Sequence, residues 1–173
     1  EKSKFPLLIN TYGTRQRMAW ALGVEDIEQI AREIEEILKT QPPSGFLDKL
    51  MMLPKLARLG SYLPKTVKSG ACQQVVCETV DLSILPYLKC WPLDGGPYIT
   101  YPVVMTKDPD TGIRNVGTYR MQVFDKQTTG MHWQIHKGGS KHFQRYRELK
   151  KKIPVAVILG GDPVYGYSAT APL

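Results

Sequence analysis

The sequence is poor in cysteine. It contains three, Cys72, Cys77 and Cys90, and their spacing includes no Cys-x-x-Cys pair. The odd number and this spacing argue against a disulfide framework. We therefore expect three reduced thiols that are buried by packing in a cytosolic protein.

Long apolar runs and the common catalytic motifs are also missing. No stretch approaches the length of a membrane span, and we recognise no signal peptide. The sequence contains no P-loop, no Gly-x-Gly-x-x-Gly, no His-Glu-x-x-His and no Ser-His-Asp order, and no acidic pair stands out as a general acid and base. It also has no internal repeat and no low-complexity segment. We therefore expect a protein without a transmembrane segment, whose chemistry does not come from these motifs.

The charge is positive but scattered, with 23 Lys and Arg against 16 Asp and Glu and a net charge of +7. The densest basic run, Arg145–Lys152, is typical of a solvated helix face. It lacks the repeated interleaving of aromatic residues that marks a base-stacking platform. A basic balance also suits phosphorylated or carboxylate ligands, so we expect no nucleic-acid partner.

The hydrophobic pattern predicts an α+β fold, in which a small α-rich region at 1–69 precedes a hairpin-rich domain at 70–173. The second region is expected to form a partial antiparallel split β-barrel. Helices are expected at Arg15–Leu22 up to Gly23, from an Asp26 cap to a stop at Gln41–Gly45, at Phe46–Leu59 with a break or kink at Pro54, and at Ser140–Lys152. Strands are expected at 5–9 (buried), 73–80, 98–106, 113–124, 131–135 and 153–159 (buried). The chain opens on Glu1 without Met and closes at Leu173 without a finishing helix, so we expect a piece of a longer protein.

The run Ile113–Phe124 carries an amide and a guanidinium, Asn115 and Arg120, in apolar company. In a regular strand these two side chains would face opposite ways, because side chains alternate. Gly117 is a natural place for a β-bulge that would correct the phase. We therefore predict a bulge at Val116-Gly117, with Asn115, Thr118 and Arg120 converging on a ligand. The alternative is that Arg120 pairs with an acid on the surface of the sheet.

A second unusual run, Met131–Ser140, contains two histidines, His132 and His136. On a strand they would lie about 13 Å apart, so at most one could belong to a given metal site. His136 is the better candidate, because the glycines after it let a phosphate or ion approach. The alternative for each is a structural histidine, hydrogen-bonded within the fold.

The segment Lys137-Gly-Gly-Ser140 precedes a helix, where backbone N–H groups favour an anion. Trp133 nearby either stacks on an aromatic ligand ring or fills the core. Together the two runs predict a site for an anionic, aromatic ligand.

Several short motifs resemble, in order and spacing, the UbiD family of decarboxylases. They are Cys72-Gln-Gln74, Cys90-Trp-Pro92, Asn115-x-Gly-x-Tyr-Arg120 and His136-Lys-Gly-Gly139, with Asn10-Thr-Tyr-Gly-Thr14 and Pro42-Pro43 before them. The resemblance implies reversible, non-oxidative decarboxylation of aromatic or α,β-unsaturated acids, with prenylated FMN, Mn²⁺ and often K⁺ as cofactors. One such substrate is a polyprenyl-4-hydroxybenzoate of ubiquinone or menaquinone biosynthesis. It implies a cytoplasmic enzyme, peripheral at the membrane if the substrate is prenylated.

The resemblance also assigns roles to residues. Arg120 matches the catalytic arginine of the family, and Asn115 and His136 match metal-site residues. The remaining matches are to cofactor contacts, to which Arg120 also belongs: Thr118, Tyr119, His132, Trp133, Gln134, Lys137 and Gly138.

The family's metal-ligand Glu, its two catalytic carboxylates and the C-terminal domain that mediates homo-oligomer assembly lie beyond the matched region. The 173-residue chain is therefore expected to be inactive alone, unless a second subunit supplies the acids. Two alternative functions stay open: a nucleic-acid-binding or scaffold fragment that uses the basic helix at 145–152, and an ordinary FMN-binding reductase.

Overall fold

The computed structural model describes residues 3–39 and 45–171, and divides the chain into two compact units. One unit combines residues 1–27 with residues 79–173, and the other comprises residues 28–78. The predicted domain boundary between residues 69 and 70 is not one of the boundaries between these two compact units, and it stays a prediction. The expected helix stop at Gln41–Gly45 and the Pro42-Pro43 match fall largely outside the described residues.

The unit of residues 28–78 is helical. It contains α2 (Glu28–Leu38), α3 (Phe46–Ser61) and a short 3₁₀ turn at Ala71–Gln73. The helix α3 continues through Pro54, so the expected break does not occur there. An ion pair of 2.9 Å joins Arg58 of α3 to Glu33 of α2.

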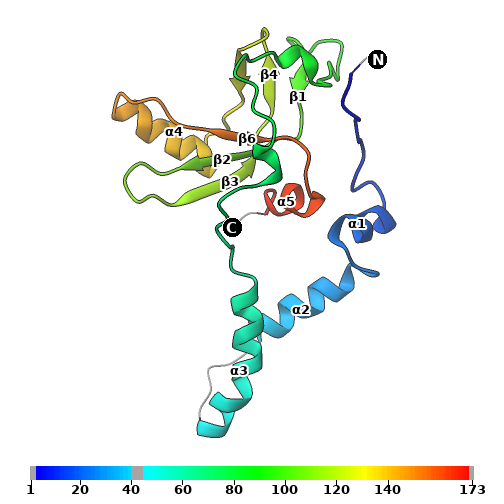
Figure 1. Ribbon diagram of the computed structural model, residues 1–173, viewed down its shortest axis with the longest axis vertical. Coiled ribbons are helices and arrows are strands. Elements are labelled where there is room, and N and C mark those ends of the chain that lie inside the picture. Colours follow the sequence, from blue (N-terminus) through cyan, green and yellow to red (C-terminus); the bar gives the residue numbers. More distant parts are fainter. Residues whose placement is uncertain (1–2, 40–44, 172–173) are drawn as a thin grey trace. The chain divides into compact units, whose positions relative to one another are not determined.

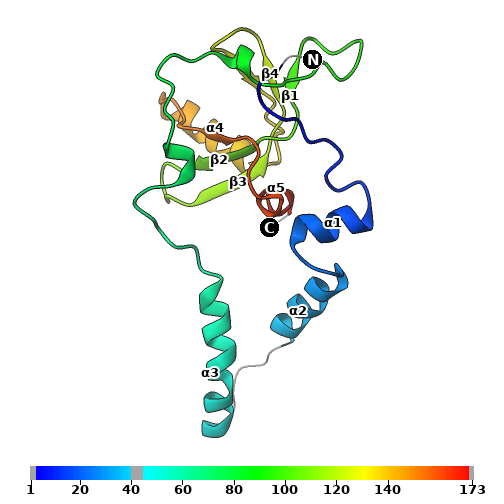
Figure 2. The same cartoon turned by 45° about the vertical axis from the view of Figure 1, so that its right-hand side comes forward.

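The other unit contains two three-stranded antiparallel sheets (Figures 1 and 2). The first has the order β3-β2-β6, formed by Arg114–Thr118, Val103–Lys107 and Ala156–Ile158. The second has the order β1-β4-β5, formed by Tyr98–Ile99, Met121–Val123 and Thr129–Met131. The α+β prediction is confirmed, and the antiparallel sheets are not closed into a barrel.

Three helices complete this unit. The helix α1 spans Arg15–Leu22 and ends at Gly23, as predicted. Thr14 caps its start, and the helix contacts α5 (Pro163–Ser168). The helix α4 (Gly138–Glu148) packs on β2 and β3 (Figure 1). Buried apolar side chains of the sheets and their connections include Pro102, Val103, Val104, Tyr119, Met121 and Val123, and Ala19 of α1 is also buried.

The expected strand at 113–124 is in fact two strands in different sheets. The strand β3 ends at Thr118 and β4 begins at Met121, so the chain crosses between the sheets at Tyr119–Arg120. The predicted bulge at Gly117 is wrong, because the β2–β3 ladder is regular there and pairs Val104 with Gly117. A Cβ atom on Gly117 would lie 2.8 Å from Cε2 of Tyr119, so this glycine makes room for a ring rather than for an extra residue.

Other apolar runs also differ from expectation. Residues 5–9 and 73–80 form no strand, and their side chains are exposed, to 74% at Leu8 and 79% at Val75. The strand β6 exists, but its residues are exposed rather than buried. The strand β5 ends at Met131, so residues 132–135 are not in a strand. These runs have the composition of buried strands, but no neighbouring element among the described residues covers them.

The three cysteines are free, as expected, but they are exposed, so the prediction that packing buries them is wrong. Among the residues that the structure describes, no helix is both long and apolar enough to cross a membrane.

Candidate functional site

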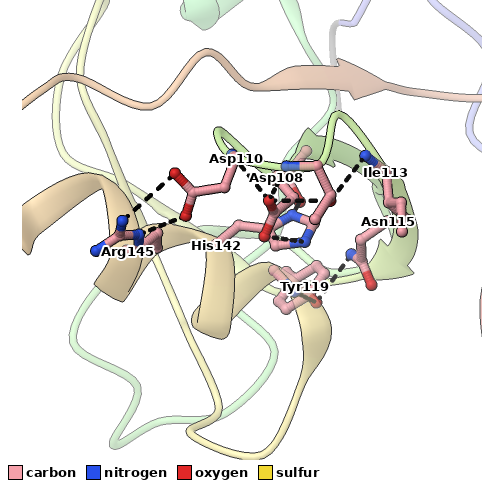
Figure 3. Close-up of polar contacts among 10 residues, drawn as sticks. Asp108, Asp110, Ile113, Asn115, Tyr119, His142 and Arg145 are labelled. Carbon is pink, nitrogen blue, oxygen red and sulfur yellow. Dashed lines mark hydrogen bonds and ion pairs between the residues drawn. The ribbon is translucent and has the colours of Figure 1, made fainter. Parts of the chain in front are cut away.

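A buried tyrosine, Tyr119, organises the start of α4. It follows β3 directly and is 3% exposed. Its hydroxyl oxygen accepts hydrogen bonds from the backbone N–H of Gly139, at 2.8 Å, and from Nδ2 of Asn115, at 3.3 Å (Figure 3). One phenol therefore connects β3 to the first turn of the helix.

The two glycines of that turn allow a close approach that no larger residue would permit. A Cβ atom on Gly139 would lie 2.7 Å from the Tyr119 hydroxyl and 2.8 Å from Cζ3 of Trp133. A Cβ atom on Gly138 would collide with the Asn115 carboxamide. The Gly-Gly pair therefore lets the helix start against Asn115 and the two aromatic rings.

Lys137 brings positive charge to the same place. It is the N-cap residue of α4, its Nζ donates to the Thr118 carbonyl at 2.8 Å, and it lies 4.9 Å from the centroid of the Tyr119 ring. Within the described residues, the backbone N–H of Gly138 donates a hydrogen bond to no protein group. A lysine beside an open N–H at a helix N-terminus is a favourable environment for an anion.

Trp133 packs among other aromatic rings. It meets Tyr119 edge-on at 5.1 Å between centroids and stacks on Phe143 of α4 at 5.6 Å, with 16° between the planes. These contacts are of the kind expected if Trp133 fills the core, and its contact with a cofactor stays a prediction. We call the set of residues gathered here the α4 N-terminal cluster: Asn115, Thr118, Tyr119, Trp133, Lys137, Gly138 and Gly139.

Arg120 lies outside this cluster in its contacts. Its Nη2 donates to Oδ2 of Asp94 at 2.9 Å, and its Cζ lies 3.7 Å from the centroid of the Tyr98 ring. Among the described residues, no contact joins Arg120 to Asn115. The structure therefore does not join the three residues expected to converge. Arg120 pairs with an acid, but that acid lies in a loop and not, as the alternative expected, on the surface of the sheet. Asp94 was missed, although the Asp94-Gly95-Gly96 run was a signal that the chain turns there.

The remaining predicted residues lie beside these groups. The His132 N–H donates to the Arg120 carbonyl at 2.9 Å, next to the pairing of β4 with β5. Gln134 and His136 are exposed in a turn closed by the Lys137 N–H and the Gln134 carbonyl, at 3.0 Å. In the described part of the chain, the His136 side chain contacts no Asn115 atom, and no three His, Cys, Asp or Glu side chains form a metal-holding group.

A second polar network, which the sequence did not indicate, attaches α4 to the β2–β3 hairpin. Nδ1 of buried His142 lies 2.9 Å from Oγ1 of Thr106, and its Nε2 lies 3.8 Å from Oδ2 of Asp108 (Figure 3). Further along the helix, Arg145 pairs with Asp110. Hydrogen bonds from the Thr111 backbone N–H, and secondarily from the Thr111 hydroxyl and the Asp110 N–H, lower the pKa of Asp108 below its usual range. This network holds the helix against the β2–β3 hairpin.

Two family models match the chain. The 3-octaprenyl-4-hydroxybenzoate carboxy-lyase Rift-related domain (UbiD) matches residues 65–173, and the N-terminal domain of the same carboxy-lyase (UbiD_N) matches residues 1–37. An uncharacterized protein of Aquifex aeolicus is 48% identical to this chain over 98% of the chain's length. An uncharacterized protein of Archaeoglobus fulgidus is 49% identical over 97% of it. These alignments cover 35% and 34% of the two relatives, so the chain spans about a third of their length.

Solved structures have the same fold. The vanillic acid decarboxylase of Sedimentibacter hydroxybenzoicus, in its closed form, matches all of this chain and 35% of its own, with a TM-score of 0.75 and 24% identity. An evolved dimeric form of the UbiD-class enzyme HmfF from Pelotomaculum thermopropionicum, in complex with prFMN, matches 87% of this chain and 31% of its own. Its TM-score is 0.61 and its identity is 26%.

Proposed function

The chain belongs to the UbiD family, and on that premise we propose that it is the flavin-binding portion of a reversible, non-oxidative decarboxylase. Its substrates would be aromatic or α,β-unsaturated carboxylic acids. The observation that carries the proposal is the α4 N-terminal cluster, where a lysine, an open backbone N–H and aromatic rings meet. Such a set of groups suits the phosphate and the ring system of a flavin better than a duplex or a peptide.

The residues of this cluster fit prenylated FMN in their chemistry. Lys137 and the first turn of α4 would hold the phosphate, because both offer donors and positive potential. The resemblance adds Thr118, Tyr119, His132, Trp133, Gln134 and Gly138 as the further contacts proposed for the cofactor.

We further propose a divalent ion, Mn²⁺, with K⁺ as a second ion, which would supply positive charge beside the cofactor phosphate. Asn115 is suited to bind the divalent ion, since its Nδ2 is engaged with Tyr119 while its carboxamide lies beside Gly138. Its oxygen is the type of ligand that hard cations prefer. His136 is the second proposed ligand, and the remaining ligands would come from phosphate oxygens or from groups beyond this chain.

Arg120 is the proposed catalytic residue. Its planar fork matches a carboxylate, so it would orient the acid group of the substrate. When bound, the cofactor supplies the electron sink that decarboxylation requires. The contribution of the guanidinium would be to bind and orient the acid group.

Flavin binding tests the proposal. The purified chain is mixed with FMN or prenylated FMN and Mn²⁺, and the flavin absorbance that co-elutes with protein is measured. Lys137→Ala should weaken binding about tenfold, because it removes a charge-assisted contact worth roughly 1.5 kcal/mol. Lys151→Ala is the matched control, since it removes the same charge from an exposed position after α4 and should leave binding unchanged.

The same preparation separates the alternatives. Failure to retain either flavin would contradict the proposal, as would equal binding by the Lys137 and Lys151 variants. Salt-sensitive binding to any DNA duplex would favour a nucleic-acid function. Oxidation of NAD(P)H by the FMN-loaded chain would favour an ordinary flavin reductase.

A further inference from the structure

The guanidinium of Arg120 is held from two sides. Asp94 accepts a hydrogen bond from its Nη2 at 2.9 Å, and the Tyr98 ring lies 3.7 Å below its Cζ. The Tyr98 ring is itself oriented, because its hydroxyl donates to Oε1 of Gln122 at 3.1 Å. An ion pair and a cation–π contact together restrict the guanidinium plane more than either would alone.

The acid in this arrangement is more enclosed than the base. The Asp94 side chain is 13% exposed, whereas that of Arg120 is 33% exposed. Asp94 Oδ2 also accepts from the Trp91 N–H at 3.1 Å, and the Asp94 N–H donates to the Trp91 carbonyl at 3.1 Å. The carboxylate is therefore fixed by its own loop and cannot follow the arginine if that side chain moves.

The loop is seated on the strand that follows Arg120. Cβ atoms on Gly95 and Gly96 would lie 3.2 Å and 3.1 Å from Nε2 of Gln122 in β4. A Cβ atom at either position would require the end of the Gln122 side chain to shift by a few tenths of an ångström. The two glycines thus let the loop lie close to the Gln122 carboxamide.

Part of the arginine fork stays open. In the part of the chain that the structure describes, Nη2 is the only guanidinium nitrogen that donates a hydrogen bond, and its acceptor is Asp94. A guanidinium has two two-point edges, Nε with Nη2 and Nη1 with Nη2, and Asp94 takes only one of the two Nη2 hydrogens, so one of these edges is left for another acceptor. This edge has the spacing that a carboxylate accepts in a two-point contact.

We propose that Asp94 is a positioning residue for Arg120. It holds the guanidinium over Tyr98 so that the two-point edge that Asp94 leaves open meets an incoming carboxylate in one orientation. It also neutralises part of the arginine charge, which limits how tightly a carboxylate binds. The inference rests on the proposed function, since it assumes that Arg120 receives an acid.

Two opposite effects of Asp94→Asn follow. The neutral amide keeps the shape of the side chain and an oxygen for the Trp91 N–H, but it no longer attracts the guanidinium as an ion. Arg120 should then rotate more freely, while its full charge should attract a carboxylate more strongly. A purely structural role for Asp94 predicts neither change, only a lower melting temperature.

Both effects can be measured on the 173-residue chain by NMR with ¹⁵N-labelled arginine and benzoate as the probe. In the wild type, the Arg120 Nη signals should be resolved by hindered rotation, and benzoate should shift the Arg120 Nε signal. In Asp94→Asn the Nη signals should collapse by fast rotation, and benzoate should bind about fivefold tighter, as expected for removal of one exposed charge interaction. Arg120→Gln identifies the signals and should abolish the benzoate response.

Asp110→Asn is the matched control, because Asp110 also pairs with an arginine, Arg145, on the exposed side of α4. It should leave the Arg120 signals and benzoate affinity unchanged. The inference is overturned if Asp94→Asn leaves the Arg120 signals resolved, if benzoate affinity does not rise, or if the wild type shows no benzoate response at Arg120. The experiment contains no flavin, so loss of flavin binding with the expected Arg120 behaviour would reject only the proposed function.

Discussion

The Tyr119 hydroxyl accepts the backbone N–H of Gly139 at 2.8 Å, and this single hydrogen bond joins the end of β3 to the beginning of α4. Both residues are buried, so the bond is shielded from water. Lys137 and Gly138, which are proposed to hold a phosphate, directly precede Gly139 in the chain. The stability of the helix start and the geometry of the candidate site therefore depend on the same contact.

Replacing Tyr119 with Phe should lower the free energy of unfolding by about 1–3 kcal/mol. The substitution leaves the buried Gly139 N–H without an acceptor, and the cost of an unsatisfied buried donor is of that size. Urea denaturation followed by circular dichroism measures it. Tyr165→Phe is the control, because that ring is 69% exposed and its loss of a hydroxyl should change stability by less than about 0.5 kcal/mol. Equal effects of the two substitutions would show that the Tyr119 bond contributes nothing.

Replacing Gly139 with Ala should also lower the free energy of unfolding, by about 1–3 kcal/mol, although alanine is normally the better helix former. The new methyl group would lie within 3 Å of both Tyr119 and Trp133. The comparison is Gly60→Ala in α3, where no atom lies within 4 Å of the new Cβ and where stability should stay level or rise by up to about 1 kcal/mol. Thermal denaturation of both variants checks the contrast. A stabilising Gly139→Ala would mean that the helix start is not packed as described.

The pH dependence of stability should include a contribution from Asp108. Hydrogen bonds from Thr111, followed by smaller effects that include His142, lower the pKa of this carboxyl in the folded chain. The stabilisation is therefore complete above the ordinary aspartate pKa of about 3.9 and is lost as the pH falls through the lowered value. In urea denaturation between about pH 5 and pH 2, the free energy of unfolding should fall less with decreasing pH in Asp108→Asn than in the wild type. Parallel curves for the two proteins would contradict this assignment.

The 173-residue chain should show no decarboxylation when it is supplied with prenylated FMN and Mn²⁺. The family resemblance matches only Arg120, the proposed catalytic residue, to the catalytic trio and places the metal-ligand Glu and both catalytic carboxylates outside the matched region. Release of CO₂ from cinnamate and from 4-hydroxybenzoate measures the outcome. Turnover by the chain alone would show that residues within it perform the missing proton transfer.

The local elements were largely predictable where one short segment decides the structure. Arg15–Leu22 forms a helix because Thr14 caps it and Gly23 ends it in the left-handed region, and both signals stand in the sequence. The β2–β3 hairpin was likewise predictable from the turn residues between its strands. The start of α4 was placed within two residues of its position, since Gly138 lies next to the predicted N-terminal turn.

The errors arose where the structure depends on distant neighbours. Ile113–Phe124 has strand composition throughout, yet its two halves pair with different partners, β2 and β1, and composition carries no record of that change. Residues 5–9 resemble a buried strand, but no described element covers them. For the same reason the gathering of Asn115, Tyr119 and Lys137 was predictable from the family motif, whereas the pairing of Arg120 with Asp94 was not.

The chain crosses between its two sheets at two consecutive residues, Tyr119 and Arg120. The described part of the chain contains no cis peptide bond. Their Cα atoms are therefore about 3.8 Å apart, a length that side-chain packing cannot stretch. One peptide unit therefore fixes the backbone distance between Tyr119, which anchors the helix, and Arg120, which is proposed to orient the substrate. Inserting a single residue between Tyr119 and Arg120 would leave both sheets able to form, but it would change the spacing between these two residues.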